Sequence, residues 1–428
     1  MSVRLGNGNW AVSSSKLLAY NDAAGPFFNK EFDFSRATTA TRINKSGLIE
    51  SVDNNIARIN FSGSSDGYLL LEPSSTNTIT ESENAGGGGN SAQKIIRTGD
   101  AAVAPDGTTT ADLLVPNTVD ANHQPYQYRD NDTSTSFVSG SNYAWSVFVK
   151  SNPTNGAQFV QMHTFVSIGG SDFVTFDIVN GTIERTGFVS SKIENYGNGW
   201  FRCSIVFAAL RDSTAGGSDG WSLSTVLAAD SSRAAGFAGD GSSYGVLGWG
   251  AQFEEQVDFA SSYIPTNGTA VTRNAELCSG SGAEQDFNSS EGVLYAEIEA
   301  LTDGTTQRSI SISSENIQNT VEIFYNSGTN QVSFRIRANN ANVTVQNRTV
   351  SDRTQFVKVA LKYKSGDIEG FINGVKEVDR TDSFTFSESL TELAFDRGGD
   401  QSHFEGRIKD LRVFTKALSD TELITLTT

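Results

Sequence analysis

Two glutamates stand two residues apart in the segment LYAEIEAL, and a pair of carboxylates is what the hydrolysis of a glycosidic bond requires. Successive side chains of a β-strand point to opposite faces, so Glu297 and Glu299 are expected on one face and Ile298 on the other. Neither a third acid nor an aromatic platform for a sugar is evident beside them. A solvent-facing strand surface is the preferred interpretation. The sequence therefore predicts no enzyme, with a polysaccharide depolymerase left as an alternative.

A second group of residues could bind a sugar without cleaving it. Sugar rings present apolar C–H faces that stack on tyrosine and tryptophan, while their hydroxyls bond to polar side chains. The segments ANHQPYQYRDND and GGSDGWS supply such residues in stretches that look partly like loops. The predicted carbohydrate-binding residues are His123, Tyr126, Tyr128, Asp219 and Trp221. Packing of the aromatic rings beneath a loop is the alternative.

Calcium is the only cofactor that the sequence suggests. Its best candidate ligands are Asp396 and Asp400 in DRGGDQS, because calcium prefers oxygen donors, and an ordinary surface turn is the alternative. The histidines His123, His163 and His403 lack the spacing of a zinc motif. The chain also has no P-loop and no G-x-S-x-G motif, so nucleotide chemistry and serine hydrolase chemistry are not predicted.

The charge balance and the hydropathy exclude several kinds of partner. Lysine and arginine total 32 against 49 aspartates and glutamates, which gives a net charge of -17 and repels the phosphate backbone of nucleic acids. No apolar run is long enough to span a membrane, and the first residues do not resemble a secretion signal. Cys203 and Cys278 are the only cysteines, so no disulfide framework is expected, and alternation in FRCSIVF predicts that Cys203 is buried.

The elements that must position these residues are β-strands. With 41 glycines, 27 phenylalanines and many short alternating runs, the composition predicts an all-β chain of tandem β-sandwich or jelly-roll domains. Trp145 and Trp249 lie in such runs and are expected in the core. The pairs Asn180-Gly181 and Asn373-Gly374 predict two hairpins with type I′ turns, since both residues of the pair tolerate positive φ.

A helix-capping motif, a proline and several glycine-rich or polar stretches predict where the domains and the one clear helix lie. Ser419 and Glu422 form a capping box, which predicts a short C-terminal helix over about 419–426. In YLLLEP a buried strand is expected to end before Pro73. Glycine-rich and polar stretches place boundaries at Gly86–Gly89 and within about 266–290. The expected ranges are 1–89 for an N-terminal module, 90–270 for a jelly roll and 271–428 for a second sandwich.

Three motifs resemble known families. The C-terminal stretch HFEGRIKDLRVFTKALSDTEL resembles the last strand and tail of laminin-G-like, concanavalin A-like lectin/glucanase domains, over about residues 288–428. The residues that carry this resemblance are Gly406, Ile408, Asp410, Arg412, Phe414, Ala417, Leu418, Ser419, Asp420 and Glu422. The middle range resembles the jelly-roll modules, related to carbohydrate-binding modules, of bacteriophage fibres, through WGAQFE at Trp249–Glu254, SYIPT at Ser262–Thr266, and Thr272–Arg273.

The N-terminal range resembles a signature of phage virion proteins. The matching residues are Arg36, Thr38, Ala40, Thr41, Arg42, Gly47, Asn55, Arg58, Leu70, Leu71, Glu72, Pro73, Thr76 and Asn77. The sequence departs from the signature after Asn77, where Ile79-Thr80-Glu81-Ser82 replaces the usual continuation.

Together the resemblances imply a fibre or spike protein on the surface of a phage virion, on the head or the tail, made in the host cytoplasm. Its N-terminal module is expected to attach to other virion proteins, and its sandwiches are expected to bind host-surface glycans. Phage fibres are commonly trimeric, so a homotrimer is expected. A purely structural or decorating virion protein is the alternative.

Overall fold

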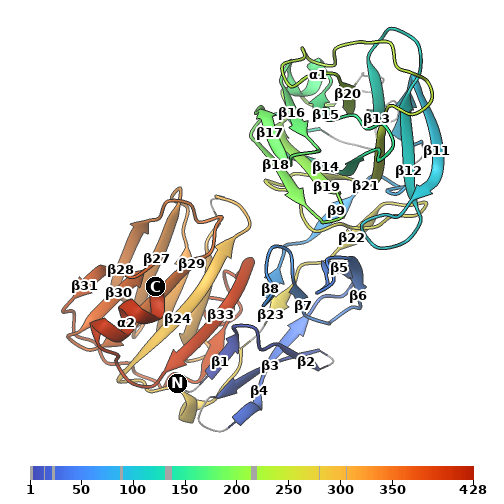
Figure 1. The fold of residues 1–428 in the computed structure, drawn as a ribbon. Helices are drawn as coiled ribbons and strands as arrows, with labels where there is room; N and C mark the ends of the chain where they lie inside the picture. Colours follow the sequence, from blue (N-terminus) through green and yellow to red (C-terminus); the bar gives the residue numbers. More distant parts are fainter. Residues whose placement is uncertain are drawn as a thin grey trace. The chain divides into compact units, whose positions relative to one another are not determined.

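The computed structural model describes residues 3–13, 15–21, 25–86, 90–130, 137–213, 219–278, 280–304 and 306–428. The regular structure of the described residues is mainly antiparallel strands (Figure 1). The helices among them are short: α1 (Val166–Gly169), η1 (Glu284–Asp286) and α2 (Asp420–Thr427). The all-β prediction is therefore confirmed. Among the residues described, no helix is long and apolar enough to cross a membrane.

The chain divides into two compact units, and each unit is assembled from separate stretches of sequence. We call them the terminal unit, made of residues 1–39, 52–73 and 274–428, and the central unit, made of residues 40–51 and 74–273. The expected ranges divided the chain differently at the N-terminus, because residues 1–89 contribute to both units and form no unit of their own. The expected boundary at Gly86–Gly89 falls largely on residues 87–89, outside the described residues.

The central unit contains two six-stranded sheets, and the core of the unit takes side chains from both. We call them the pocket sheet and the back sheet. The pocket sheet has the strand order β10 (Asn90–Gln93), β13 (His123–Asp130), β20 (Asp219–Val226), β15 (Phe159–Thr164), β16 (Phe173–Asp177), β17 (Thr182–Arg185). The back sheet has the order β11 (Ile95–Ala102), β12 (Ala111–Pro116), β21 (Val246–Glu255), β14 (Asn142–Ser151), β19 (Phe201–Ala208), β18 (Ser190–Asn195). Trp145, Trp249 and Cys203 are buried as predicted.

The terminal unit is also built on two sheets. Nine strands of its twelve-stranded sheet follow the order β23 (Leu277–Cys278), β4 (Gly25–Ser35), β3 (Lys16–Asn21), β1 (Val3–Gly6), β33 (Gly406–Phe414), β24 (Glu291–Ala300), β29 (Val357–Lys364), β30 (Ile368–Ile372), β31 (Val375–Arg380). The other three are β2 (Ala11–Ser13), β7 (Arg58–Asn60) and β8 (Tyr68–Leu71). The second sheet has the order β28 (Ala341–Thr349), β27 (Gln331–Ala338), β26 (Thr320–Tyr325), β25 (Arg308–Ser313), β32 (Glu392–Ala394). Two short pairs, β5 (Ala40–Ile43) with β6 (Ile49–Val52) and β9 (Ser75–Asn77) with β22 (Val271–Arg273), complete the described strands.

Pairing between distant parts of the chain explains why the first residues form no module. Strand β1 pairs with β33, Val3 opposite Val413, so the start of the chain extends a sheet built mostly from its end. The YLLL strand β8 is buried throughout and also pairs with β33, with Leu70 opposite Arg407. The strand ends before Pro73, as predicted, and the chain enters the central unit at Ser74.

The two predicted hairpins are present, but only one has the predicted turn. Asn373 and Gly374 have φ of 46° and 82°, as a type I′ turn requires. At the other hairpin only Gly181 has positive φ, and its N–H donates to the carbonyl of Asp177 at 2.9 Å. The type I′ prediction for Asn180-Gly181 is wrong because the carboxylate of Asp177 accepts two backbone N–H groups of the loop and stabilises a longer turn.

The C-terminal helix begins as the capping box predicted. Ser419 is the N-cap of α2, and its N–H donates to Glu422 Oε2 at 2.8 Å. The helix covers Asp420–Thr427, within one residue of the predicted range at each end. Leu423 turns inward and packs with Val293 and Phe371 of the twelve-stranded sheet.

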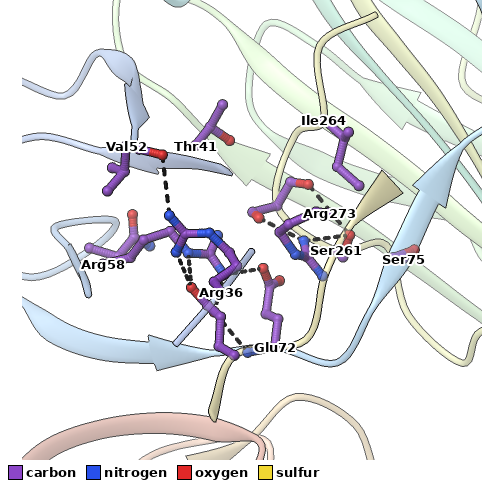
Figure 2. A network of polar contacts seen from close by, with 12 residues as sticks. Arg36, Thr41, Val52, Arg58, Glu72, Ser75, Ser261, Ile264 and Arg273 are labelled. Atoms are coloured by element: carbon purple, nitrogen blue, oxygen red, sulfur yellow. Dashed lines mark hydrogen bonds and ion pairs between the residues drawn. The ribbon is translucent and has the colours of Figure 1, made fainter. Parts of the chain in front are cut away.

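Residues of the N-terminal signature meet in a buried ionic cluster of the terminal unit. Glu276 Oε1 accepts hydrogen bonds from Arg36 Nη1 and from Arg58 Nε, both at 2.7 Å. Arg58 Nη2 also donates to Glu72 Oε2 at 2.7 Å, and Figure 2 shows Arg36, Arg58 and Glu72 side by side. Burial by itself would lower the pKa of Arg58, but the carboxylates of Glu276 and Glu72 raise it above its usual value. Each charge of the cluster therefore has an opposite partner, which offsets the cost of burying it.

A second polar network lies in the central unit and contains Asn77 of the N-terminal signature together with residues of the middle motif. Asn77 Nδ2 donates to the carbonyl of Ile264 at 2.9 Å. Arg273 Nη1 donates to Ser261 Oγ at 3.1 Å (Figure 2). Glu254 Oε1 accepts from Ser75 Oγ at 2.6 Å. The motif residues thus stabilise loops and strand ends, which is a structural role.

The ionic cluster predicts a large effect of one substitution. Glu276→Gln keeps the shape of the side chain but leaves Arg36 and Arg58 without their shared charge, so we expect the free energy of unfolding to fall by about 3–5 kcal/mol. Urea unfolding followed by circular dichroism measures it. Glu50→Gln is the control: Glu50 pairs with Arg42 near the surface, with 36% and 29% of the two side chains exposed, and should cost under about 1 kcal/mol. An equal small loss in both variants would contradict the role given to Glu276.

Candidate functional site

The aromatic residues that the sequence put forward for sugar binding lie in the core of the central unit. Tyr126, Tyr128 and Trp221 are at most 7% exposed. Tyr128 and Trp221 are directly opposite each other on β13 and β20, and their rings stack at 4.1 Å between centroids. The predicted stacking of these rings on a ligand is therefore wrong, because the face of the strand that carries them points toward the back sheet.

The two polar residues of the same prediction are also buried. Asp219, which is 2% exposed, forms an ion pair with Arg211. His123 is fully buried, and its two ring nitrogens lie 2.8 Å from the carbonyl oxygens of Lys94 and Phe237. Direct contact of either residue with a sugar is therefore a wrong prediction as well. His123 instead holds together two segments of the chain, around Lys94 and around Phe237.

The opposite face of the pocket sheet is polar. Gln127, Ser222 and His163 stand in one row across β13, β20 and β15, because Ser222 is directly opposite both of the others. In a second row, Gln161 of β15 lies opposite Ser224. All five side chains are buried, which is informative because polar groups are seldom buried without a partner or a ligand.

The loop from β20 to β21, residues 227–245, covers part of this polar face. The side-chain amide of Gln161 donates to the carbonyl of Ser231 at 3.0 Å and accepts from the N–H of Ala234 at 2.7 Å. Arg233 Nη2 donates to the carbonyl of Thr164. These contacts fix the loop over β15 and bring Arg233 to the edge of the polar face.

Between this loop, β10, β13 and α1 lies a pocket of about 400 Å³. Its lining residues are Gln93, Lys94, Asn122, Gln124, Gln127, His163, Phe165, Val166, Arg233 and Ala234. Side-chain amides therefore form much of the wall, and Phe165 and Val166 add an apolar patch. Amides both donate and accept hydrogen bonds, so the arrangement suits a ligand with several hydroxyl groups.

The charged residues that line the pocket are both cationic. No carboxylate is among the described lining residues, and the two cations are Lys94 and Arg233. Burial, together with the positive charge of Arg233, lowers the pKa of His163 to about 3, so this imidazole is neutral near pH 7. His163 Nε2 lies 2.8 Å from Ser224 Oγ, and within the described residues Ser222 Oγ has no hydrogen-bond partner.

The sequence analysis identified two strands of the polar face, β13 and β20, but it selected side chains on the opposite, buried core face of these strands. Gln124 and Gln127 lie in the same segment as Tyr126 and Tyr128. Alternation separates only Gln127 from the two tyrosines, because Gln124 has their parity and the register of the strand shifts between His123 and Tyr126. His163 and Arg233, from other parts of the chain, carried no motif that pointed to a site. Only the pairing of β13, β20 and β15 brings them together.

The predicted calcium ligands lie close together in the terminal unit, with a third residue beside them. Oxygen atoms of Asp396 and Asp400 and a ring nitrogen of His403 lie within 4.8 Å of one another. Asp396 Oδ1 already accepts the N–H of Gly398 at 2.5 Å. Calcium prefers six to eight oxygen donors, whereas a set with an imidazole nitrogen fits zinc-like ions better. Calcium binding here stays a prediction.

The glutamate pair of LYAEIEAL lies on β24 of the terminal unit. Glu299 forms an ion pair with Arg407 of β33, and Glu297 Oε1 lies 3.9 Å from Lys409 Nζ. Burial raises the pKa of Glu297, and the lysine beside it opposes the shift. Glu297 is partly exposed but Glu299 is buried, so the predicted solvent-facing surface holds for Glu297 only.

Comparison with known proteins identifies part of the chain. Residues 283–424 match the family model of the concanavalin A-like lectin/glucanases superfamily. This match confirms the resemblance found at the C-terminus and shows a lectin-like β-sandwich domain within the terminal unit. No curated protein matches the chain in sequence.

Solved structures similar to about a third of the chain include sugar-binding domains. The carbohydrate-binding module of a Ruminococcus gnavus sialidase, bound to α2,3-sialyllactose, has 17% identity and a TM-score of 0.30, covering 35% of this chain and 94% of that one. Domain 4 of a Geobacillus stearothermophilus arabinanase, in complex with arabinotriose, has 12% identity and a TM-score of 0.29, covering 36% and 77%. A pentraxin from Limulus polyphemus has 14% identity and a TM-score of 0.28, covering 36% and 74%.

The neutral, buried state of His163 predicts how stability depends on pH. The folded pKa of about 3 lies below the usual 6.5, so between these values the unfolded chain binds a proton that the folded chain does not. The free energy of unfolding therefore falls as the pH drops, by about 2 kcal/mol from pH 7 to pH 5 for this group.

The matched variant is His163→Gln, which still offers a hydrogen bond to Ser224 and does not titrate. Its loss of stability between pH 7 and pH 5, measured by urea unfolding, should be smaller than that of the unmodified protein by about the same 2 kcal/mol. Identical pH dependence of both proteins would show that His163 is already protonated, or exposed, in the folded state.

Proposed function

We propose that the protein binds glycans, and that the pocket of the central unit is its binding site. The observation that carries this proposal is the composition of the pocket wall, which combines side-chain amides of Asn122, Gln124 and Gln127 with the apolar side chains of Phe165 and Val166. A saccharide has the same two kinds of surface, hydroxyl groups around the ring and apolar C–H faces. A volume of about 400 Å³ accommodates a small saccharide rather than a long chain.

The terminal unit supports the same general role. Its residues 283–424 match the concanavalin A-like lectin/glucanases superfamily, which supports sugar binding by this unit as well. We assign no catalytic activity to either unit, since Glu297 and Glu299 are engaged with basic side chains of β33.

We further propose that the chain is a fibre or spike protein on a phage virion and binds host-surface glycans during adsorption. The support is the resemblance of the N-terminal and middle motifs to those of phage virion proteins. Attachment to other virion proteins and a trimeric assembly belong to this proposal. The signature residues Arg36, Arg58 and Glu72 have a structural role in it, because they are buried in the ionic cluster.

A glycan array tests the binding function. We expect the full chain to bind a subset of immobilised oligosaccharides, and the double variant Gln124→Ala, Gln127→Ala to bind them at least about tenfold more weakly, because two hydrogen-bonding amides are lost from the pocket wall. Asn195→Ala, which removes an exposed amide from the back sheet, is the matched control and should bind normally. An array without any bound glycan, or equal binding by the double variant, would refute the assignment.

The assembly state tests the virion proposal separately. Light scattering coupled to size-exclusion chromatography should give the mass of three chains. A monomer at all concentrations would contradict a trimeric fibre without touching the glycan-binding proposal.

A further inference from the structure

We propose that the pocket of the central unit selects an anionic saccharide, one that bears a carboxylate or a sulfate group, and that Lys94 and Arg233 bind the anionic group. This inference rests on the proposed glycan-binding function and adds the chemical class of the ligand.

The charge of the pocket is opposite to the charge of the protein. The chain has a net charge of -17, yet both charged side chains of the pocket wall are cationic and no acid lines it among the described residues. A neutral ligand would gain no binding energy from this concentration of positive charge. An anion inside the pocket is little repelled by the carboxylates elsewhere on the protein, because at physiological salt their electrostatic field is screened over about 8 Å.

Arg233 is held in a position to bind an anion. Its Nη2 donates to the carbonyl of Thr164, and the neighbouring Ala234 is fixed by the side chain of Gln161. Among the described residues no carboxylate forms an ion pair with Arg233, and its buried Nε has no hydrogen-bond partner. A guanidinium that keeps N–H groups available binds a carboxylate or a sulfate through two parallel hydrogen bonds.

Lys94 is fixed through its backbone and keeps an exposed side chain. Its carbonyl oxygen lies 2.8 Å from His123 Nδ1 and accepts the N–H of Asn117 at 3.0 Å. Lys94 is one of the residues that line the pocket, and the described part of the chain contains no acidic partner for its ammonium group. The buried His123 thus has a role at this site after all, as a positioning residue for the segment that carries Lys94.

The remaining wall is neutral and recognises the rest of the sugar. His163 stays uncharged near pH 7, and Gln124 and Gln127 provide amides. A ligand that satisfies the whole pocket therefore combines one anionic group with several hydroxyls, as an acidic monosaccharide unit does. An inorganic anion would contact only the two cations and not the neutral part of the wall.

The experiment compares acidic oligosaccharides with their neutral counterparts on the full chain. The array carries uronate-containing, sialylated and sulfated oligosaccharides, each beside the same oligosaccharide without its acidic group. Affinities for the best pair follow by isothermal titration for the unmodified protein, Arg233→Gln, Lys94→Gln and the control Lys192→Gln, which removes a cation from the back sheet. Circular dichroism confirms that each variant is folded.

We expect the acidic member of a pair to bind at least about tenfold more tightly, and each pocket variant to lose about tenfold while the control loses nothing. Binding should also weaken as salt rises. If neutral and acidic members bind alike and the pocket variants have no effect, the inference is wrong and the glycan-binding function stands. If no oligosaccharide of either kind binds, both fail. The uronate, sialylated and sulfated arms distinguish a carboxylate from a sulfate.

Discussion

The alternation of side chains along β13, β20 and β15 is the constraint on which the site of this protein depends. Each strand has one face in the core and one face turned away from it, and the register of the pairing decides which residues share a face. Tyr128 and Trp221 therefore stack inside the sandwich, whereas Gln127, Ser222 and His163 form a polar row outside. A shift of one residue in either pairing would exchange the two sets.

The same sheet shows how a polar face becomes a pocket. A flat sheet face would leave its side-chain amides in water. Here the Gln161 amide binds the loop of residues 227–245 through both its nitrogen and its oxygen and holds the loop over the sheet. The loop brings Arg233 close to His163, which is one reason why the imidazole is neutral. Burial, charge and hydrogen bonding at the site are thus consequences of one loop position.

Buried ionic and polar networks explain why distant motifs occur in one sequence. Glu276 joins Arg36 and Arg58 across more than two hundred residues of chain, and each of these charges would be costly to bury alone. Motifs of this kind mark the family of a protein because they are required for folding. The residues that line the pocket of the central unit, such as Lys94, His163 and Arg233, belong to none of these motifs.

Local rules of the sequence determined the class of fold, the strands, the hairpin at Asn373-Gly374 and the capped helix after Ser419. Each of these depends on neighbours a few residues apart, so the sequence contains the whole cause. The same rules gave a wrong turn at Asn180-Gly181, because hydrogen bonds to the side chain of Asp177 stabilise a different turn. They also gave the wrong sugar-binding residues, because packing against the back sheet determines which face of the strand is buried in the core.

The tertiary structure alone decided the composition of the two units and of the pocket. Pairing of β1 and β8 with β33 places the first residues in a sheet formed by the last ones, whereas residues 40–51 and 74–273 fold as the other unit. Lys94, His163 and Arg233 come from three different segments and meet because strands pair across long stretches of sequence. Such pairing depends on the free energy of the whole sandwich, which no single stretch of sequence encodes.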